Sequence, residues 1–260
     1  MIPINTVIDL DGTIYRGDQL IDHVKPFFAL LNENNINYKL FTNCSKRTPA
    51  ELALTLKEMG LDVKESDIIT SGCITKRYLQ NIGKRPFVYA VGSASFKEYL
   101  QTGDVELVNG TDGLADYVVV GFCTDFSYED LTQAMRHIQK GAKFIATNSD
   151  DTIPVGNNEA PHTGAICSFL EYASKQKPLY LGKPSSYAGN YFREIFGSND
   201  VYVVGDRIDT DMHFAMNNGF TGYLVLTGIT TPQDTESATG HSFHIFNDLL
   251  DLCNHFQKQL

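Results

Sequence analysis

The segment Asp9-Leu10-Asp11-Gly12-Thr13, which follows an apolar run close to the first residue, constrains this chain more than any other stretch. Val7 and Ile8 are β-branched and, together with Ile2 and Ile4, favour a short buried strand, whose acidic end would be costly to bury. Residues two apart in a strand project to the same face, so Asp9 and Asp11 can converge on one point. Two ionised carboxylates repel each other there, so the pair needs a cation, a shared proton or a compensating field. A turn or a helix cap is the alternative interpretation.

Strand and helix patterns alternate after this segment. A helix is expected over residues 24–34, a strand over 38–42, a helix from about Thr48 to Gly60, and a strand over 68–70 with a helix after it. Thr48 and Glu51 have capping-box spacing, and a glycine is typical just past a helix end. This alternation predicts an α/β fold, in which a Rossmann-like parallel sheet carries helices on both faces and binds ligands beyond the carboxyl ends of its strands.

A second α/β series lies in mid-chain. Strands are expected over residues 87–91, near 105, over 117–120 and over 143–147, with helices after Ser93 and Ser127 and over 164–175. The first pattern then resumes with apolar strands before Gly182 and Gly205, a final core strand over 222–226 and a closing helix over 246–256. We therefore expect residues 81–178 to be a domain inserted into a core formed by residues 1–80 and 179–260.

Composition and charge narrow the functional class. The net charge is −10, which argues against a nucleic-acid surface, and no stretch of about 18 apolar residues indicates a membrane span. The first residues lack the basic segment and apolar run of a secretory signal, so a cytoplasmic location is expected. The five cysteines are widely spaced without a Cys-x-x-Cys pair, which indicates neither a disulfide framework nor a zinc cluster.

Four of the expected loops share one pattern, in which an apolar strand ends and polar residues follow. In chain order these residues are Asp9 and Asp11, then Thr42 and Asn43, then Lys183, then Asp206, Asp209 and Asp211. Carboxylates without clustered His or Cys suit Mg²⁺, which prefers oxygen ligands and often binds together with a substrate phosphate. Lys183 and Thr42 would then hold the phosphoryl oxygens.

Phosphoryl transfer fits this set of residues, because it depends mainly on positioning and on charge neutralisation. A carboxylate can also serve as the nucleophile in such a reaction. Asp9 would attack phosphorus, while Asp11 would protonate the leaving oxygen and then deprotonate the hydrolytic water. Asp206 would complete the metal site.

The four loops, in this order, resemble the four motifs of the haloacid dehalogenase (HAD) superfamily. More narrowly, the chain resembles the NagD-like or p-nitrophenyl-phosphatase branch, whose members carry a large α/β cap between the second and third motifs. Residues 144–148 and 164–166 of the insert share this likeness. The resemblance implies a HAD core with an inserted cap, and a Mg²⁺-dependent phosphatase that acts on small phosphorylated metabolites such as nucleoside monophosphates or sugar phosphates. Neither nucleic acid nor a membrane is expected as a partner, and family members often form homo-oligomers through the cap.

The resemblance also implies a role for each matching residue. Asp9 is the nucleophile, Asp11 is the acid/base and lends its backbone carbonyl to the metal, and Lys183 stabilises charge. Phosphate binding is implied for Thr42 and Asn43, with Lys183 beside them. We add Asn148, Asp150 and Arg207 as further candidates for substrate binding, which the resemblance itself does not assign. The metal site is assigned to Asp9, Asp11, Asp206 and Asp211, the last of which more often orients a neighbour or a water molecule in the family.

The chain departs from the family pattern in two places. Cys44 and Ser149 occupy positions where Asn, Ser or Pro is expected, and His162 replaces a common glycine. Because glycine permits backbone angles that are costly for histidine, the loop over residues 150–162 is expected to run differently here. We hypothesise that three polar side chains of the insert face the leaving group of the substrate, namely Asn148, Asp150 and His162. The alternative is that they are ordinary polar loop residues.

Two other functions remain open at this point. A phosphotransferase such as a sugar-phosphate mutase would use the same aspartyl-phosphate, although the mutases of this superfamily carry helical caps at a different position. A catalytically silent phosphate-binding module would be expected to lack Asp9 or Asp11. A P-loop is excluded by spacing, since Pro184 follows Lys183 and Lys177 replaces the earlier glycine.

Overall fold

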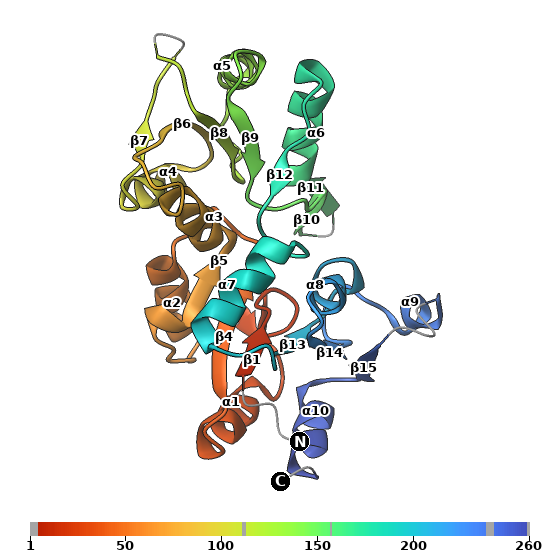
Figure 1. The fold of residues 1–260 in the computed structure, drawn as a ribbon. Coiled ribbons are helices and arrows are strands. Elements are labelled where there is room, and N and C mark those ends of the chain that lie inside the picture. Colours follow the sequence, from red (N-terminus) through yellow and green to blue (C-terminus); the bar gives the residue numbers. More distant parts are fainter. Residues whose placement is uncertain (1–4, 111–112, 157, 238–241, 259–260) are drawn as a thin grey trace. The chain divides into compact units, whose positions relative to one another are not determined.

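The computed structural model describes residues 5–110, 113–156, 158–237 and 242–258, which form two compact units (Figure 1). Unit 1 comprises the described residues of Met1–Thr42, Pro49–Ile69 and Lys183–Leu260. Unit 2 comprises Asn43–Thr48 and the described residues of Thr70–Gly182. The chain therefore passes from one unit to the other four times.

Unit 1 is built on a six-stranded sheet with the strand order β15-β14-β13-β1-β4-β5. The strands are β1 (Asn5–Ile8), β4 (Asn37–Thr42), β5 (Ile68–Thr70), β13 (Tyr202–Gly205), β14 (Thr221–Val225) and β15 (Phe243–Phe246). β1 runs parallel to β13 and β4, and β14 runs parallel to β13 and β15. A hairpin of β2 (Tyr15–Arg16) and β3 (Gln19–Leu20) follows β1. The predicted α/β class with a parallel sheet is confirmed.

Helices cover both faces of this sheet, as alternation along β4 illustrates. Leu40 packs in the core cluster that includes Phe27 and Phe256, whereas the ring of Phe41 lies 4.9 Å from that of Phe192, centroid to centroid. Since neighbouring strand residues point to opposite faces, the two clusters lie on opposite sides of the sheet. The helices of unit 1 are α1 (Val24–Glu33), α2 (Pro49–Glu58), η1 (Glu65–Asp67), α7 (Ser186–Phe196), η2 (Ile208–Met212), α8 (His213–Asn217), α9 (Pro232–Ser237) and α10 (Leu249–Gln257).

Unit 2 has its own five-stranded parallel sheet with the order β12-β9-β8-β6-β7. The strands are β6 (Phe87–Val91), β7 (Glu106–Leu107), β8 (Tyr117–Val120), β9 (Lys143–Ala146) and β12 (Leu179–Tyr180), and a separate hairpin pairs β10 (Thr152–Val155) with β11 (Asn158–Pro161). Its helices are α3 (Ser71–Gln80), α4 (Ala94–Gln101), α5 (Tyr128–Gln139) and α6 (Thr163–Ser174). Val118 and Val120 pack with Leu131 of α5 and Leu170 of α6 in one buried cluster.

The structure differs from the sequence predictions in several elements. The division into units falls at Thr70 and Gly182 rather than at residues 81 and 178, because α3 packs on α4 and β12 pairs with β9. The strand over 222–226 is not the last one: β15 follows it, and the predicted closing helix begins at Leu249 instead of residue 246. The polar loop over 148–162 contains the β10–β11 hairpin.

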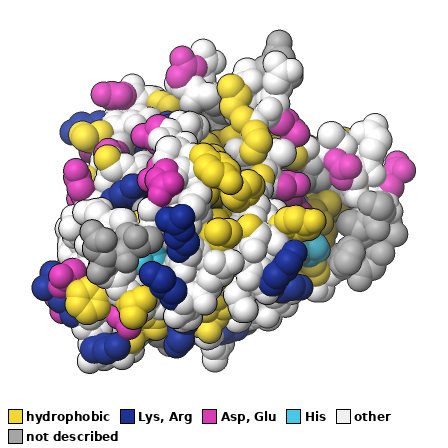
Figure 2. Space-filling model, turned by 90° about the horizontal axis from the view of Figure 1, so that it is seen from above, with side chains coloured by type: hydrophobic (Ala, Val, Ile, Leu, Met, Phe, Trp, Pro, Cys, Tyr) yellow, Lys and Arg dark blue, Asp and Glu magenta, His cyan; other side chains and the backbone are white. Residues whose placement is uncertain are grey.

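Surface features agree with the mixed composition. Acidic and basic side chains are interspersed with hydrophobic ones on the face shown in Figure 2. All five cysteines are free, and all except the half-buried Cys44 are buried. Within the described ranges, no helix has the length and apolar character that a membrane span requires.

Candidate active site

Two predicted acids leave the sheet of unit 1 at the same edge. Asp9 follows β1 directly and Asp206 follows β13 directly, and these two strands are parallel neighbours with Ile8 opposite Val204. The amide nitrogen of Asp9 donates to the carbonyl of Val204 at 2.8 Å, which extends the ladder to the first acid. The register of two strands therefore places the side chains of Asp9 and Asp206 together.

Asp211 completes a group of three buried carboxylates. One oxygen from each of Asp9, Asp206 and Asp211 lies within 4.8 Å of the others. Asp211 belongs to the single π-helical turn η2, and the main-chain nitrogen of Arg207 donates to its Oδ2 at 3.1 Å. Three carboxylates at this separation repel one another strongly, so the group requires positive charge.

Lys183 supplies one positive charge to this group. Its Nζ donates to Oδ1 of Asp9 at 2.6 Å, to Oδ1 of Asp211 at 2.7 Å and to the carbonyl of Phe41 at 3.0 Å. The residue is 3% exposed, so its three donors are all matched by acceptors inside the protein. Lys183 thus links the ends of β1 and β4 to η2.

The electrostatics of the site follow from burial and from these charges. Burial, reinforced by Asp211 and Asp206, raises the pKa of Asp9 well above its ordinary value against the opposing charge of Lys183. Burial and the charge of Asp211 raise the pKa of Asp206 to about 7. Although burial acts in the opposite direction, the charges of Asp211 and Asp9 raise the pKa of Lys183. The single positive charge of Lys183 therefore does not balance the three carboxylates of the site.

Asp206 is enclosed by glycines and keeps one oxygen without a protein partner. A Cβ atom on Gly12 would lie 2.4 Å from its Oδ2, and one on Gly228 would lie 1.8 Å from the same atom. The amide nitrogen of Ile229 donates to Oδ2 at 2.7 Å, whereas Oδ1 is buried and has no hydrogen-bond partner among the described residues. A buried carboxylate oxygen in this state is the kind of atom that a hard cation satisfies.

Asp11 is placed differently from the buried acids. Its side chain is exposed, and Oη of Tyr15 donates to its Oδ2 at 3.1 Å. Its carboxylate is not one of the three that converge, which agrees with a metal contact through the backbone carbonyl alone. Thr42, the last residue of β4, is 3% exposed.

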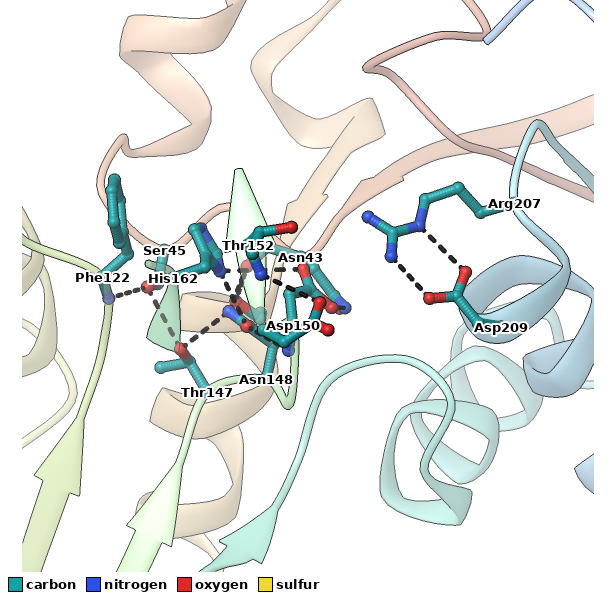
Figure 3. A network of polar contacts seen from close by, with 12 residues as sticks. Asn43, Ser45, Phe122, Thr147, Asn148, Asp150, Thr152, His162, Arg207 and Asp209 are labelled. Carbon is teal, nitrogen blue, oxygen red and sulfur yellow. Dashed lines mark hydrogen bonds and ion pairs between the residues drawn. The ribbon is translucent and has the colours of Figure 1, made fainter. Parts of the chain in front are cut away.

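Arg207 is engaged with a neighbouring acid rather than standing alone. Its Nε donates to Oδ1 of Asp209 at 3.0 Å, and its NH2 group lies 2.5 Å from Oδ2 of the same residue (Figure 3). This two-pronged ion pair gives Asp209 a partner and fixes the orientation of the guanidinium. The predicted role of Arg207 in substrate binding stays a prediction.

The other predicted substrate-binding residues lie together in unit 2 (Figure 3). Nδ2 of Asn43 donates to Oδ1 of Asp150 at 2.9 Å, and Nδ2 of Asn148 donates to the carbonyl of Asn43 at 2.8 Å. Asn148 is fully buried, and Nδ1 of His162 lies 3.2 Å from its Oδ1. These residues therefore contact one another through side-chain and main-chain atoms, and Asn148 and His162 are enclosed by protein.

His162 does not carry the backbone strain that its replacement of glycine suggested. Its φ of −107° and ψ of −164° are extended, and any residue adopts them. The close approach that needs a glycine occurs instead at Gly164, where a Cβ atom would lie 2.5 Å from the carbonyl oxygen of Ser149.

Sequence reasoning missed several contributors to the site of unit 1. Gly228 and the amide of Ile229 contact Asp206, the carbonyl of Phe41 accepts from Lys183, and the hydroxyl of Tyr15 binds Asp11. Gly228 could have been identified from the sequence, because it is a glycine that comes shortly after the expected strand now seen as β14, at the same edge of the sheet. Main-chain contacts such as that of Phe41 leave no signature in residue identity.

Comparisons with known proteins agree with this geometry. The model of haloacid dehalogenase-like hydrolases matches residues 6–106, and a second model of HAD-like hydrolases matches residues 180–252. An acid sugar phosphatase from Staphylococcus saprophyticus is 33% identical over 254 residues, with 97% of each chain covered.

Solved structures show the same relationship. A 4-nitrophenylphosphatase from Thermotoga maritima superimposes with a TM-score of 0.91 at 32% identity, covering 96% of both chains. A glycerol phosphate phosphatase from Mycobacterium tuberculosis, solved in complex with magnesium, gives 0.87 at 27% identity and covers 96% of this chain and 76% of that one. The predicted p-nitrophenyl-phosphatase branch is thereby confirmed. The chain belongs to the haloacid dehalogenase-like hydrolases and is a phosphoric monoester hydrolase.

Proposed function

We propose that this enzyme hydrolyses small phosphate monoesters with the help of Mg²⁺, through an aspartyl-phosphate intermediate, the acyl phosphate formed on Asp9. The observation that carries the proposal is the buried group of Asp9, Asp206 and Asp211 with Lys183 held between two of them. This group contains a carboxylate that can act as the nucleophile, one lysine ammonium held in place, and more negative than positive charge.

The acidic group fits Mg²⁺ on the chemistry of its donors. All three are carboxylates, Oδ1 of Asp206 lacks a partner among the described residues, and the pKa of Asp206 is raised to about 7 by burial and by Asp211. Asp9, Asp206 and Asp211 would hold the ion together with the carbonyl of Asp11, and the ion would neutralise phosphoryl oxygens when bound. The magnesium complex of the M. tuberculosis relative supports this assignment.

The proposed reaction uses the chain's own residues in two steps. In the first, a carboxylate oxygen of Asp9 forms a bond to phosphorus as the bond from phosphorus to the ester oxygen breaks, and Asp11 gives its proton to that oxygen. In the second, Asp11 takes a proton from water, the water oxygen attacks phosphorus, and phosphate leaves Asp9. Lys183 binds Oδ1 of Asp9, so Oδ2 is left to attack. The exposure of Asp11 suits a group that exchanges protons with substrate and water.

Sugar phosphates and other small esters, including nucleoside monophosphates, are the proposed substrates. Relatives described as acid sugar phosphatases and glycerol phosphate phosphatase support this class. Thr42 would hold the phosphoryl group alongside Lys183, and its neighbour Asn43 is assigned to the same task by resemblance to the family.

The test is the release of inorganic phosphate from p-nitrophenyl phosphate, measured with Mg²⁺ and with a chelator. Wild-type enzyme should need Mg²⁺, and Asp9→Asn should abolish turnover because an amide is a poor nucleophile. Asp18→Asn, at an exposed acid of the β2–β3 turn, is the matched control and should keep full activity. Hydrolysis that persisted in Asp9→Asn would refute the covalent step. Turnover of a sugar bisphosphate without phosphate release would instead indicate a mutase.

A further inference from the structure

The segment Asn43–Thr48 follows β4 of unit 1 but belongs to unit 2. Its carbonyl at Asn43 accepts from Oγ of Ser71 at 2.6 Å, and its carbonyl at Lys46 accepts from Oγ of Ser93 at 2.9 Å. Oγ of Ser45 accepts from the main-chain nitrogen of Phe122 at 2.9 Å. Unit 2 therefore fixes the conformation of the residues that come directly after Thr42.

Asn148 is the centre of the contacts around Asn43. Its Nδ2 donates to the carbonyl of Asn43, and its Oδ1 accepts from the main-chain nitrogen of Asp150 at 3.1 Å. Because Nδ2 faces a carbonyl acceptor and Oδ1 faces an N–H donor, the orientation of the Asn148 amide is defined. Asp150, oriented in this way, presents Oδ1 to the side-chain amide of Asn43. Both the main chain and the side chain of Asn43 are held by these two residues.

His162 also contacts the side-chain oxygen of Asn148 (Figure 3). Its Nδ1 lies 3.2 Å from Oδ1 of Asn148, which is an acceptor, so Nδ1 carries the proton and donates. The ring stacks on Phe122 with 4.3 Å between centroids and 23° between planes, and the residue is 4% exposed. Oδ2 of Asp150 lies 3.9 Å from the same nitrogen. The ring is therefore locked by packing and aimed by a hydrogen bond.

We propose that His162 is a positioning residue for phosphate binding: through Asn148 and Asp150, it fixes Asn43 in the conformation in which the consecutive residues Thr42 and Asn43 bind the phosphoryl group. This inference rests on the proposed function of Thr42 and Asn43. It replaces the hypothesis that His162 itself faces the leaving group, because the ring is buried against Phe122 and Asn148. A residue that acts in this way changes the affinity for the phosphoryl group by the same factor in every ester, whatever the leaving group.

Three variants separate the hydrogen bond of His162 from its packing. His162→Ala removes both, His162→Phe keeps a ring beside Phe122 without a donor, and His162→Asn offers an amide nitrogen close to the position of Nδ1. We expect His162→Ala and His162→Phe to raise both the KM for p-nitrophenyl phosphate and the inhibition constant of inorganic phosphate by about 3- to 10-fold, the effect of one buried hydrogen bond. The kcat should change by less than about 2-fold, and His162→Asn should recover most of the affinity for phosphate.

The matched control is His137, a second buried histidine of unit 2. Its ring lies 5.0 Å from that of Tyr89, and its Nε2 lies 2.8 Å from the carbonyl of Gly110. His137→Ala should lower the melting temperature and leave the affinity for phosphate unchanged. In an Asn148→Ala background, His162→Ala should have no additional effect, because its contact is already lost.

Phosphate affinities of Thr42 and His162 variants test the proposed function and this inference separately. Thr42→Val removes one hydroxyl, and unchanged phosphate affinity in that variant would refute the phosphate-binding role of the loop itself. If Thr42→Val weakens phosphate binding but His162→Phe does not, the positioning role of His162 is wrong. A KM effect of His162→Ala that differs among esters would show that His162 contacts the leaving group and would equally overturn the inference.

Discussion

Gly12→Ala should impair metal binding although it replaces no charged residue. Gly12 has a φ of +85°, and its absent Cβ leaves room for Oδ2 of Asp206, which would lie 2.4 Å from a new methyl group. Because non-bonded heavy atoms essentially never lie within 3.0 Å of a Cβ atom, the carboxylate must move away by about 0.6 Å. Metal sites tolerate about 0.2 Å in ligand distance. The Mg²⁺ concentration for half-maximal phosphatase activity should therefore rise by about 10- to 100-fold.

Gly17→Ala is the control for the backbone component of this change. Gly17 has a φ of +63° and lies in the nearby β2–β3 turn, where nothing is within 4 Å of an added Cβ. Gly17→Ala should lose about 1–2 kcal/mol of stability in urea denaturation, and Gly12→Ala at least as much, since both force a non-glycine residue into the left-handed region. Only Gly12→Ala should show the altered Mg²⁺ requirement. Equal Mg²⁺ requirements in the two variants would refute the idea that Asp206 is a metal ligand enclosed by Gly12.

Three further predictions concern charge and capping. Lys183→Met should lower kcat by at least about 100-fold in the phosphate-release assay, and should cost about 3–5 kcal/mol in chelator-treated protein, because Asp9 and Asp211 lose their shared cation. The folded-state pKa of Asp206, about 7, exceeds its ordinary 3.8, so its contribution to the stability of metal-free protein is present below about pH 4 and lost as the pH rises through 7. The increase in melting temperature on adding Mg²⁺ should accordingly be larger at about pH 8 than at about pH 5, and an increase independent of pH would contradict this assignment. Ser127→Ala should cost about 1 kcal/mol in urea denaturation with unchanged kcat, because the capping box of α5 is lost.

The sequence contained enough information for the regular elements and for the edge of the sheet at which the acids meet. The strand over 117–120 is found with its predicted bounds, since Tyr117–Val120 is a continuous apolar run of a fully buried strand. β15 was missed because Phe243-His244-Ile245-Phe246 does not alternate cleanly between apolar and polar residues, and because Phe246 also fits the start of the expected helix over 246–256. Only pairing with β14 makes that segment a strand.

The candidate site was predictable as far as residue type and strand end determine it. Asp9, Lys183, Asp206 and Asp211 come together because parallel strands place their carboxyl ends at one edge. The direction in which Asn148 points was not predictable, since its partner Asn43 lies 105 residues earlier in the chain. An asparagine in an exposed loop and a buried asparagine that makes several hydrogen bonds cannot be told apart in a sequence.

The assignment of Asn43–Thr48 to unit 2 determines how this enzyme could be recombined with its relatives. A donor fragment that spans only Thr70–Gly182 would bring the main-chain nitrogen of Phe122 without the hydroxyl of Ser45 and the carboxylate of Asp150 without the side-chain amide of Asn43 wherever the recipient differs at these positions. Each buried group left without its partner costs about 1–3 kcal/mol. A functional chimera therefore has to carry two pieces of sequence from the same parent, the long insert and the six residues that follow β4.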